Sequence, residues 1–203
     1  MESTGIAASR ALDQIVSIGG LVRTKQAREL GIQSRVLKQL VQENKLEQIS
    51  RGLYRIPDKH PISNPDLFTV AARIPNGVIC LVSALSFHDI TTQIPNKVFI
   101  ALDRMTETPR LDYPPLSIHR FSGKAFSEGV EIHTVDGIDV KVYSAEKTLA
   151  DCFKFRNKIG MDVAIEALKF YRSRKKIKMK DVYHFARICR VENIMRPYLE
   201  AVV

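Results

Sequence analysis

The sequence predicts an α+β fold, in which a small helical N-terminal domain precedes a mostly antiparallel sheet and a C-terminal helical bundle. Apolar residues recur at helical spacing up to residue 44 and again after residue 144, and they alternate with polar residues in several segments between. Three prolines in residues 57–65 indicate an extended connection. We therefore expect one domain at residues 1–60 and a second at residues 66–203, sheet-rich over 66–143 and helical over 144–203.

The composition excludes several classes of protein. The chain has 203 residues, of which 45% are hydrophobic and 26% charged, as in an ordinary globular protein. Its cysteines, Cys80, Cys152 and Cys189, are far apart and form no C-x-x-C pair, so neither a zinc site nor a disulfide framework is indicated. No apolar stretch reaches the ~20 residues of a membrane span, and residues 1–10 carry no apolar signal core. We expect a cytoplasmic protein that has no membrane partner and no cofactor.

Positive charge is concentrated at the two ends of the chain. The formal net charge is +9, made up of +4 in residues 1–62, −2 in residues 63–143 and +7 in residues 144–203. An excess of this size favours a polyanionic partner. The two ends are therefore the candidates for binding a polyanion, and the middle third is not.

A turn between two short helices is the most informative feature of the first domain. Helices are predicted over residues 9–18, 24–30 and 34–44. Thr24 is a suitable N-cap for the second helix, and Gly31 suits its C-terminal end. Because Ala27 is small and Gly31 tolerates a positive φ, the second and third helices can cross at a steep angle. This arrangement predicts a helix-turn-helix with Ser34–Gln42 as its recognition helix.

A basic β-hairpin is predicted directly after the recognition helix. Two short β-prone runs in residues 46–57 flank Arg51 and Gly52, which predicts a wing that could reach phosphates or the minor groove. In the recognition helix, Arg and Lys can donate to guanine or phosphate, and Gln can bond adenine. The candidate DNA-binding residues of this winged helix-turn-helix are Arg23, Thr24, Lys25, Gln33, Ser34, Arg35, Lys38, Gln39, Ser50, Arg51 and Arg55. The alternative is a pair of hairpins with a solvated basic face.

A second basic region lies near the C-terminus, where six of the nine residues 172–180 are Lys or Arg. The candidate accessory phosphate-binding residues are Arg172, Arg174, Lys175, Lys176 and Lys178. They could add a nonspecific, salt-dependent contribution to nucleic-acid binding. The alternative is a solvated loop, and the absence of aromatic residues from the run argues against base stacking.

The residue pattern gives little support for an enzyme. An acid followed by acid-x-Lys at strand ends is typical of metal-dependent nucleases, and Asp103, Asp139 and Lys141 fit that spacing. The same pattern is common on a solvated strand edge. His88 and the serines before it form no nucleophile elbow, and the five histidines lack metal-ligand spacing. We therefore expect no catalytic or metal-binding residue, and the nuclease is kept as an alternative.

The chain resembles the AbiEi family of antitoxins over nearly its full length. These proteins are the transcriptional-regulator half of bacterial AbiE-type, type IV toxin–antitoxin pairs that act in abortive infection, a form of phage defence. The resemblance rests on the predicted winged module, on Cys80–His88 and above all on Lys141–Gly160, which reads KVYSAEKTLADCFKFRNKIG.

This resemblance implies a function for each domain. In the family, the N-terminal winged helix binds inverted repeats in double-stranded DNA upstream of its own operon and represses it. The C-terminal domain counteracts a nucleotidyltransferase-like toxin, without necessarily forming a stable complex with it. The resemblance carries DNA binding onto Gln33, Ser34, Arg35, Lys38, Gln39, Arg51 and Arg55. A module that sequesters the toxin directly is the further alternative.

Overall fold

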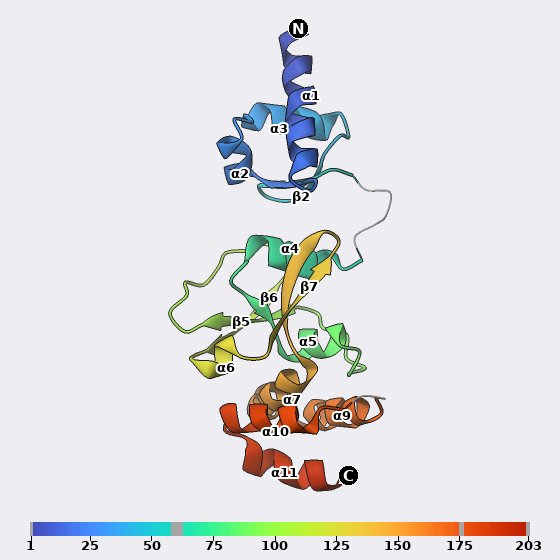
Figure 1. Cartoon of the computed structure of the whole chain (residues 1–203), viewed down its shortest axis with the longest axis vertical. Helices are drawn as coiled ribbons and strands as arrows, with labels where there is room; N and C mark the ends of the chain where they lie inside the picture. Colours follow the sequence, from blue (N-terminus) through green and yellow to red (C-terminus); the bar gives the residue numbers. More distant parts are fainter. Residues whose placement is uncertain (1, 58–62, 175–176, 202–203) are drawn as a thin grey trace. The chain divides into compact units, whose positions relative to one another are not determined.

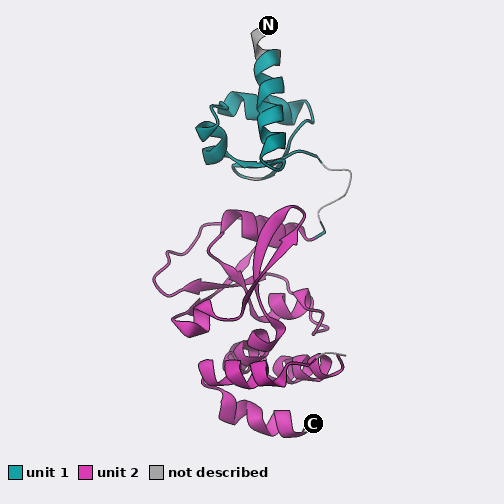
Figure 2. Ribbon diagram, in the orientation of Figure 1, with its two compact units in different colours: residues 1–63 teal, residues 64–203 magenta. Residues whose placement is uncertain are grey.

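The computed structural model describes residues 2–57, 63–174 and 177–201 of the chain. It divides into an N-terminal unit, Met1–Ser63, and a C-terminal unit, Asn64–Val203 (Figure 2). The N-terminal unit contains α1 (Glu2–Ser17), β1 (Leu21–Arg23), α2 (Thr24–Glu29), α3 (Ser34–Gln42), β2 (Glu47–Ser50) and β3 (Leu53–Arg55) (Figure 1). The C-terminal unit contains α4 (Pro65–Arg73), β4 (Val78–Ile79), α5 (Leu81–Phe87), β5 (Val98–Asp103), β6 (Leu116–Phe121), α6 (Lys124–Ser127), β7 (Val130–Val135), β8 (Ile138–Tyr143), α7 (Ala145–Lys154), α8 (Arg156–Ile159), α9 (Met161–Arg172), α10 (Met179–Ile188) and α11 (Glu192–Ala201).

The N-terminal unit packs its helices around a small apolar core. Ile15 of α1 and Leu37 and Leu40 of α3 are completely buried. The strands form an antiparallel sheet in the order β1-β3-β2, and Val22 pairs with Tyr54 beside this core. Helix α1 begins earlier than the expected residue 9, because periodicity alone did not reveal its polar first turns. The predicted region of helix-turn-helix type is present.

The five-stranded sheet of the C-terminal unit is mixed, and this corrects the expectation of a mostly antiparallel sheet. Its strand order is β6-β5-β4-β8-β7. The β5–β6 and β4–β8 pairs are parallel, whereas the β4–β5 and β7–β8 pairs are antiparallel. The connection over residues 104–115 is long enough to return the chain to the same end of the sheet, which a parallel pair requires. Alternation of side chains predicts a strand but not its direction.

The β7–β8 hairpin has the tight turn that an Asp-Gly pair between two alternating segments favours. Its turn residues Asp136 and Gly137 both have positive φ, at 49° and 81°. Such a turn continues the twist of the flanking strands, which explains the preference for Asp-Gly at this point. The hairpin ends at Tyr143, so it delivers the chain directly into α7.

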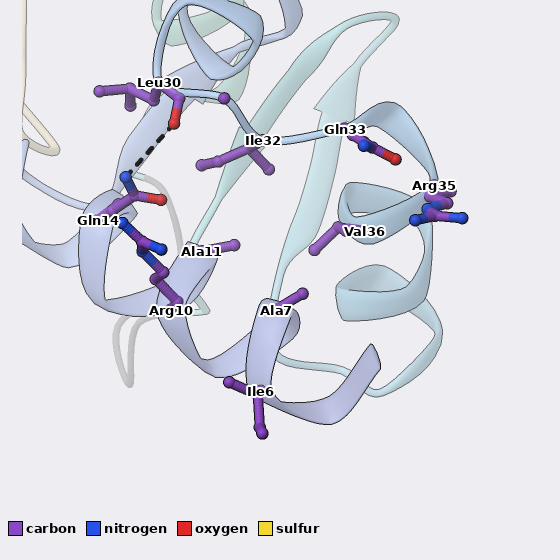
Figure 3. Close-up of a pocket in the computed structure, with 11 residues that line it drawn as sticks. Ile6, Ala7, Arg10, Ala11, Gln14, Leu30, Ile32, Gln33, Arg35 and Val36 are labelled. Atoms are coloured by element: carbon purple, nitrogen blue, oxygen red, sulfur yellow. Dashed lines mark hydrogen bonds between the residues drawn. The ribbon is translucent and has the colours of Figure 1, made fainter. Parts of the chain in front are cut away.

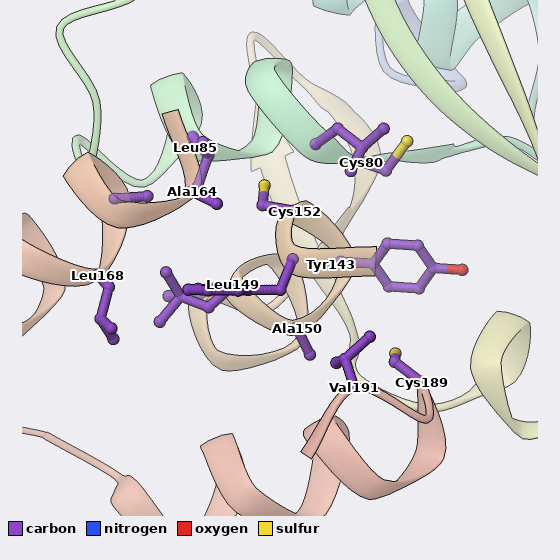
Figure 4. Close-up of a cluster of buried hydrophobic side chains, with 14 of the residues drawn as sticks. Cys80, Leu85, Tyr143, Leu149, Ala150, Cys152, Ala164, Leu168, Cys189 and Val191 are labelled. Atoms are coloured by element: carbon purple, nitrogen blue, oxygen red, sulfur yellow. The ribbon is translucent and has the colours of Figure 1, made fainter. Parts of the chain in front are cut away.

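The two faces of the C-terminal sheet are covered by different helices. Ile100 and Val142 belong to the core beneath α4, whereas the next residues along each strand, Ala101 and Tyr143, belong to the core shared with α5 and the C-terminal helices. Figure 4 shows part of that second core around Leu149. The strict alternation of a strand therefore divides one sheet between two cores. All three cysteines, Cys80, Cys152 and Cys189, are buried and form no disulfide, and all three are labelled in this view.

Helix α7 is buried on every side. Lys147 and Asp151 are completely buried, and Lys147 Nζ lies 2.6 Å from both carboxylate oxygens. Lys147 Nζ also lies 4.2 Å from the centroid of the Tyr143 ring, and Cys189 Sγ donates to Asp151 Oδ1 at 3.2 Å. Burial raises the pKa of Asp151, and the neighbouring Lys147 charge opposes that shift. The interior charges are thus paired, as buried charges must be.

The start of α7 has a side-chain cap. Ser144 is the N-cap of α7, and its hydroxyl accepts from the backbone N–H of Lys147 at 3.2 Å, as expected for a capping serine. Within the described part of the chain, every helix is too short or too polar to cross a membrane.

Candidate nucleic-acid interface

The turn between α2 and α3 has the geometry that its sequence predicts. Gly31 has a φ of +77°, and a Cβ added there would meet no atom within 4 Å, so the backbone conformation alone favours glycine. The backbone N–H of Ile32 donates to the carbonyl of Ala27 at 2.8 Å, and Ala27 is completely buried. The turn therefore fixes the direction in which α3 leaves α2.

Helix α3 presents one apolar face and one polar face. Val36, Leu37 and Leu40 are buried in the core. On the other side Arg35 and Lys38 are exposed, as are Gln33 and Ser34 before and at the start of the helix. Residues three apart lie on the same face of a helix, so Arg35 and Lys38 offer two cations side by side.

Gln39 is half-buried, and its side-chain amide already makes a hydrogen bond within the helix region. Its Nε2 donates to Glu43 Oε1 at 2.8 Å, one turn further along the chain. Lys45 also pairs with Glu43 at 2.8 Å, and these two hydrogen bonds lower the pKa of the Glu43 carboxyl, Lys45 having the larger effect. Gln39 would have to exchange this bond for one to a base.

The start of α2 lies against the β2–β3 hairpin. The backbone N–H of Thr24 donates to the carbonyl of Gly52 at 2.9 Å. The prediction that Thr24 caps α2 is wrong, since Arg23 occupies the N-cap position and its side chain makes no capping hydrogen bond. Strand β1 pairs with β3 and leads directly into α2. The acceptor for the Thr24 N–H is therefore the Gly52 carbonyl of the hairpin, and not a capping side chain. Lys25 and Arg51 are exposed on these neighbouring segments.

Two hairpin candidates are placed differently from Arg51. The side chain of Arg55 is only 12% exposed, and its Nη2 lies 3.1 Å from Glu47 Oε2 on the neighbouring strand. Its Nε is buried and makes no hydrogen bond within the described part of the chain. Ser50 lies in β2, and its side chain is outside the described residues. Arg55 therefore braces the hairpin in this conformation, which the sequence pattern did not indicate.

A hollow of about 440 Å³ lies between α1 and the helix-turn-helix. Figure 3 shows Ala11, Ile32 and Val36 along its apolar floor, with Arg10 and Arg35 at its sides (Figure 3). Arg10 was not among the residues predicted to bind DNA. Its position could have indicated it, because Arg10 directly precedes the buried Ala11 on a helix expected to pack beside the recognition helix. Arg10 extends the positive surface around the start of α3.

The basic residues near the C-terminus lie in the other unit. Arg172 is half-buried, and its Nη1 is buried without a hydrogen-bond partner among the described residues. Arg174 is also half-buried; burial lowers the pKa of His88, and the Arg174 charge contributes to that shift. The side chain of Lys178 is exposed. The remaining two candidates, Lys175 and Lys176, lie outside the described residues.

The residues of the nuclease alternative make local hydrogen bonds. Asp103 accepts from the backbone N–H of Met105 at 2.9 Å, Asp139 accepts from the Thr134 hydroxyl at 3.2 Å, and Lys141 Nζ donates to the carbonyl of Pro75 at 3.0 Å. Across the described ranges, no group of three His, Cys, Asp or Glu side chains could hold a metal ion. Each of the three side chains therefore has a hydrogen-bond partner within the C-terminal unit.

The helix-turn-helix region and its exposed basic helix lie within a segment that matches a known family model. Residues 10–57 match the family model described as "Transcriptional regulator, AbiEi antitoxin". This match supports the resemblance to AbiEi antitoxins that the sequence predicts. The matched family is one of transcriptional regulators.

A solved structure shares the fold. The chain is similar to the crystal structure of the RV2827C protein from Mycobacterium tuberculosis, with a TM-score of 0.55 and 16% sequence identity. The similarity covers 96% of this chain and 81% of the other. No curated protein matches the chain.

Proposed function

We propose that this protein is a sequence-specific DNA-binding autorepressor and antitoxin, whose N-terminal unit is a winged helix-turn-helix. The observation that carries the proposal is the exposed face of α3, with Arg35 and Lys38 presented from a helix-turn-helix turn inside the segment that matches the family. The basic residue at the tip of the β2–β3 hairpin, Arg51, supports its role as the wing.

In the proposed complex, α3 lies in the major groove. Arg35 and Lys38 donate to guanine or to phosphate oxygens, and Gln39 leaves Glu43 to bond adenine. Arg51 reaches the phosphates beside the groove, and the start of α2 positions Lys25 on the backbone. Base contacts from α3 supply specificity, whereas the cations of the wing and of α2 supply affinity that falls with salt.

The proposed operator consists of inverted repeats upstream of the protein's own operon. Two copies of the chain would read the two half-sites, because a palindromic site presents the same surface twice. For helix-turn-helix proteins the half-site centres lie roughly 34–36 Å apart, or a multiple of this spacing. The measured spacing of protected bases in a footprint tests this geometry.

The experiment that tests DNA recognition compares charge-matched variants. Binding of the full chain to its own upstream region is measured by mobility shift over a range of salt concentrations. The Arg35→Ala/Lys38→Ala variant should bind at least tenfold more weakly, with a salt slope reduced by roughly one unit for each lost phosphate contact. The control is Lys124→Ala/Lys169→Ala, which removes the same charge from exposed positions of the C-terminal unit.

Two outcomes would contradict this assignment. Equal affinity of the Arg35→Ala/Lys38→Ala variant and the unchanged protein would remove α3 as the recognition helix. An equal loss in the control variant would show that net charge, not the face of α3, determines binding. Circular dichroism of each variant checks that the fold is retained.

The C-terminal unit is proposed to counteract a nucleotidyltransferase-like toxin, with the basic residues around Arg172 and Lys178 as accessory phosphate contacts. The test co-expresses toxin and antitoxin and measures growth. A chain with Arg35→Ala/Lys38→Ala should still restore growth when both genes are driven from a foreign promoter, because repression is then not needed. Loss of growth rescue would contradict the proposal that DNA binding resides in the N-terminal unit and toxin neutralisation in the C-terminal unit.

Gel filtration of the two proteins distinguishes two mechanisms of neutralisation. Sequestration gives a stable complex of toxin and antitoxin, whereas an indirect mechanism does not.

A further inference from the structure

A second hollow, of about 430 Å³, lies in the C-terminal unit beside β5, β6 and α8. Its polar lining is formed by Lys97, Ser117, His119 and Lys158, and Val82 and Phe99 are among its apolar walls. No carboxylate is among the residues that line it. The hollow is thus positively charged although it lies largely in the acidic middle third of the chain.

The two lysines of this hollow are available to a ligand. Lys97 and Lys158 are exposed, and neither forms an ion pair with a carboxylate in the described part of the chain. Lys97 Nζ lies 5.6 Å from the centroid of the Phe99 ring, and Lys158 Nζ lies 5.8 Å from that of Phe155. These aromatic faces hold the ammonium groups near the hollow without neutralising them.

The charges of Lys97 and Lys158 both act on His119. Its side chain is buried, its ring is stacked on Phe99 at a centroid distance of 5.8 Å, and its Nε2 lies 3.2 Å from Ser117 Oγ. Burial, together with the Lys158 and Lys97 charges, lowers the pKa of His119 to about 4. The imidazole is therefore neutral at pH 7, and it lies within the electrostatic reach of both lysines.

We propose that this hollow binds a phosphate-bearing small molecule of nucleotide size. Lys97 and Lys158 would contact the phosphate as point charges, and the Ser117 hydroxyl would donate to it. Ligand sites commonly have volumes of about 300–1,000 Å³, so inorganic phosphate alone would leave most of the space empty. The proposal is independent of DNA recognition, because every residue in it belongs to the C-terminal unit.

The phosphate of this ligand belongs to a free molecule in our proposal, not to a nucleic-acid backbone. Strands β5 and β6 and helix α8 contribute to the lining of the hollow, and the lining residue His119 is only 7% exposed. A concave site with a buried imidazole suits a small ligand better.

The experiment titrates the full chain with ATP and with AMP by calorimetry, with adenosine as the phosphate-free control. ATP should bind and adenosine should not. Lys97→Ala and Lys158→Ala should each weaken binding about tenfold, because each removes a charge-assisted contact. Lys169→Ala, at an exposed position of α9, should leave the affinity unchanged. In an NMR titration, bound nucleotide should raise the pKa of His119, since the phosphate offsets the two ammonium charges.

Several results would overturn the proposal. These are the absence of heat with both nucleotides, equal binding of adenosine, or equal affinities in the two lysine variants and the unchanged chain. A pKa of His119 that stays the same in saturating ATP would place the ligand elsewhere. If neither nucleotide binds while Lys97→Ala/Lys158→Ala loses affinity for a random duplex, the lysines serve DNA instead. None of these outcomes bears on α3, which is tested separately through Arg35 and Lys38.

Discussion

Helices α3 and α7 use their polar residues in opposite ways. In α3 the charged residues Arg35 and Lys38 are exposed, and only an apolar stripe is buried. In α7 the charged pair Lys147 and Asp151 is completely buried. Charge on the surface of α3 is free to meet a partner, whereas charge inside α7 is already satisfied. A polar residue in a helix therefore indicates a binding surface only when its environment is known.

The largest effect is expected from breaking the buried pair. Asp151→Ala leaves Lys147 charged in an apolar core and should lower the free energy of unfolding by about 3–5 kcal/mol. Urea denaturation of the full chain measures the loss. The control replaces both partners, Lys147→Met/Asp151→Leu, which removes the stranded charge and should recover much of the stability. A nearly neutral Asp151→Ala would show that water reaches the pair.

An intermediate effect separates the two faces of α3. Leu40 is completely buried, so Leu40→Ala should cost about 3 kcal/mol of unfolding free energy through lost burial and the cavity left behind. Lys38→Ala, two positions earlier and exposed, should change stability by less than about 0.5 kcal/mol while weakening DNA binding. Comparable destabilisation by the two substitutions would mean that Lys38 has a structural role and would break the comparison.

The smallest effect concerns how the two helices begin. Ser144 caps α7 through its hydroxyl, so Ser144→Ala should cost about 1 kcal/mol. The N-cap of α3 is Gln33, which makes no side-chain capping hydrogen bond. Ser34→Ala, just inside α3, should therefore change stability by only a few tenths of a kcal/mol. Thermal unfolding of the two variants gives the difference, and an equal loss would indicate a cap at α3 that this conformation lacks.

Much of the fold could be predicted from local pattern. Alternation and an Asp-Gly turn defined the β7–β8 hairpin, and Gly31 defined the turn before α3, because both signals depend on neighbouring residues. The sheet's order and directions could not be predicted. Ile79 of β4 pairs with Val142 of β8, although β5, β6 and β7 lie between these strands in the sequence. Neither strand carries a residue pattern that specifies its partner.

The candidate sites also differ in whether local sequence pattern could predict them. The face of α3 follows from helical spacing, so Arg35 and Lys38 were predicted on one face. The bond between Gln39 and Glu43 was implicit in their i, i+4 spacing, although the bracing of Arg55 by Glu47 needed the strand register. The hollow around His119 could not be predicted, because its residues come from separate elements that only the tertiary structure brings together.

The pairing of Ile79 with Val142 also affects the order in which the chain folds during synthesis. Every strand pair of the N-terminal unit is complete once Arg55 has been made. The centre of the other sheet must wait for Val142. Because domains commonly fold as units, N-terminal first, as they leave the ribosome, we expect the N-terminal unit to be folded while the rest of the chain is still being translated. The DNA recognition proposed for the N-terminal unit would then be available before the C-terminal unit has been made.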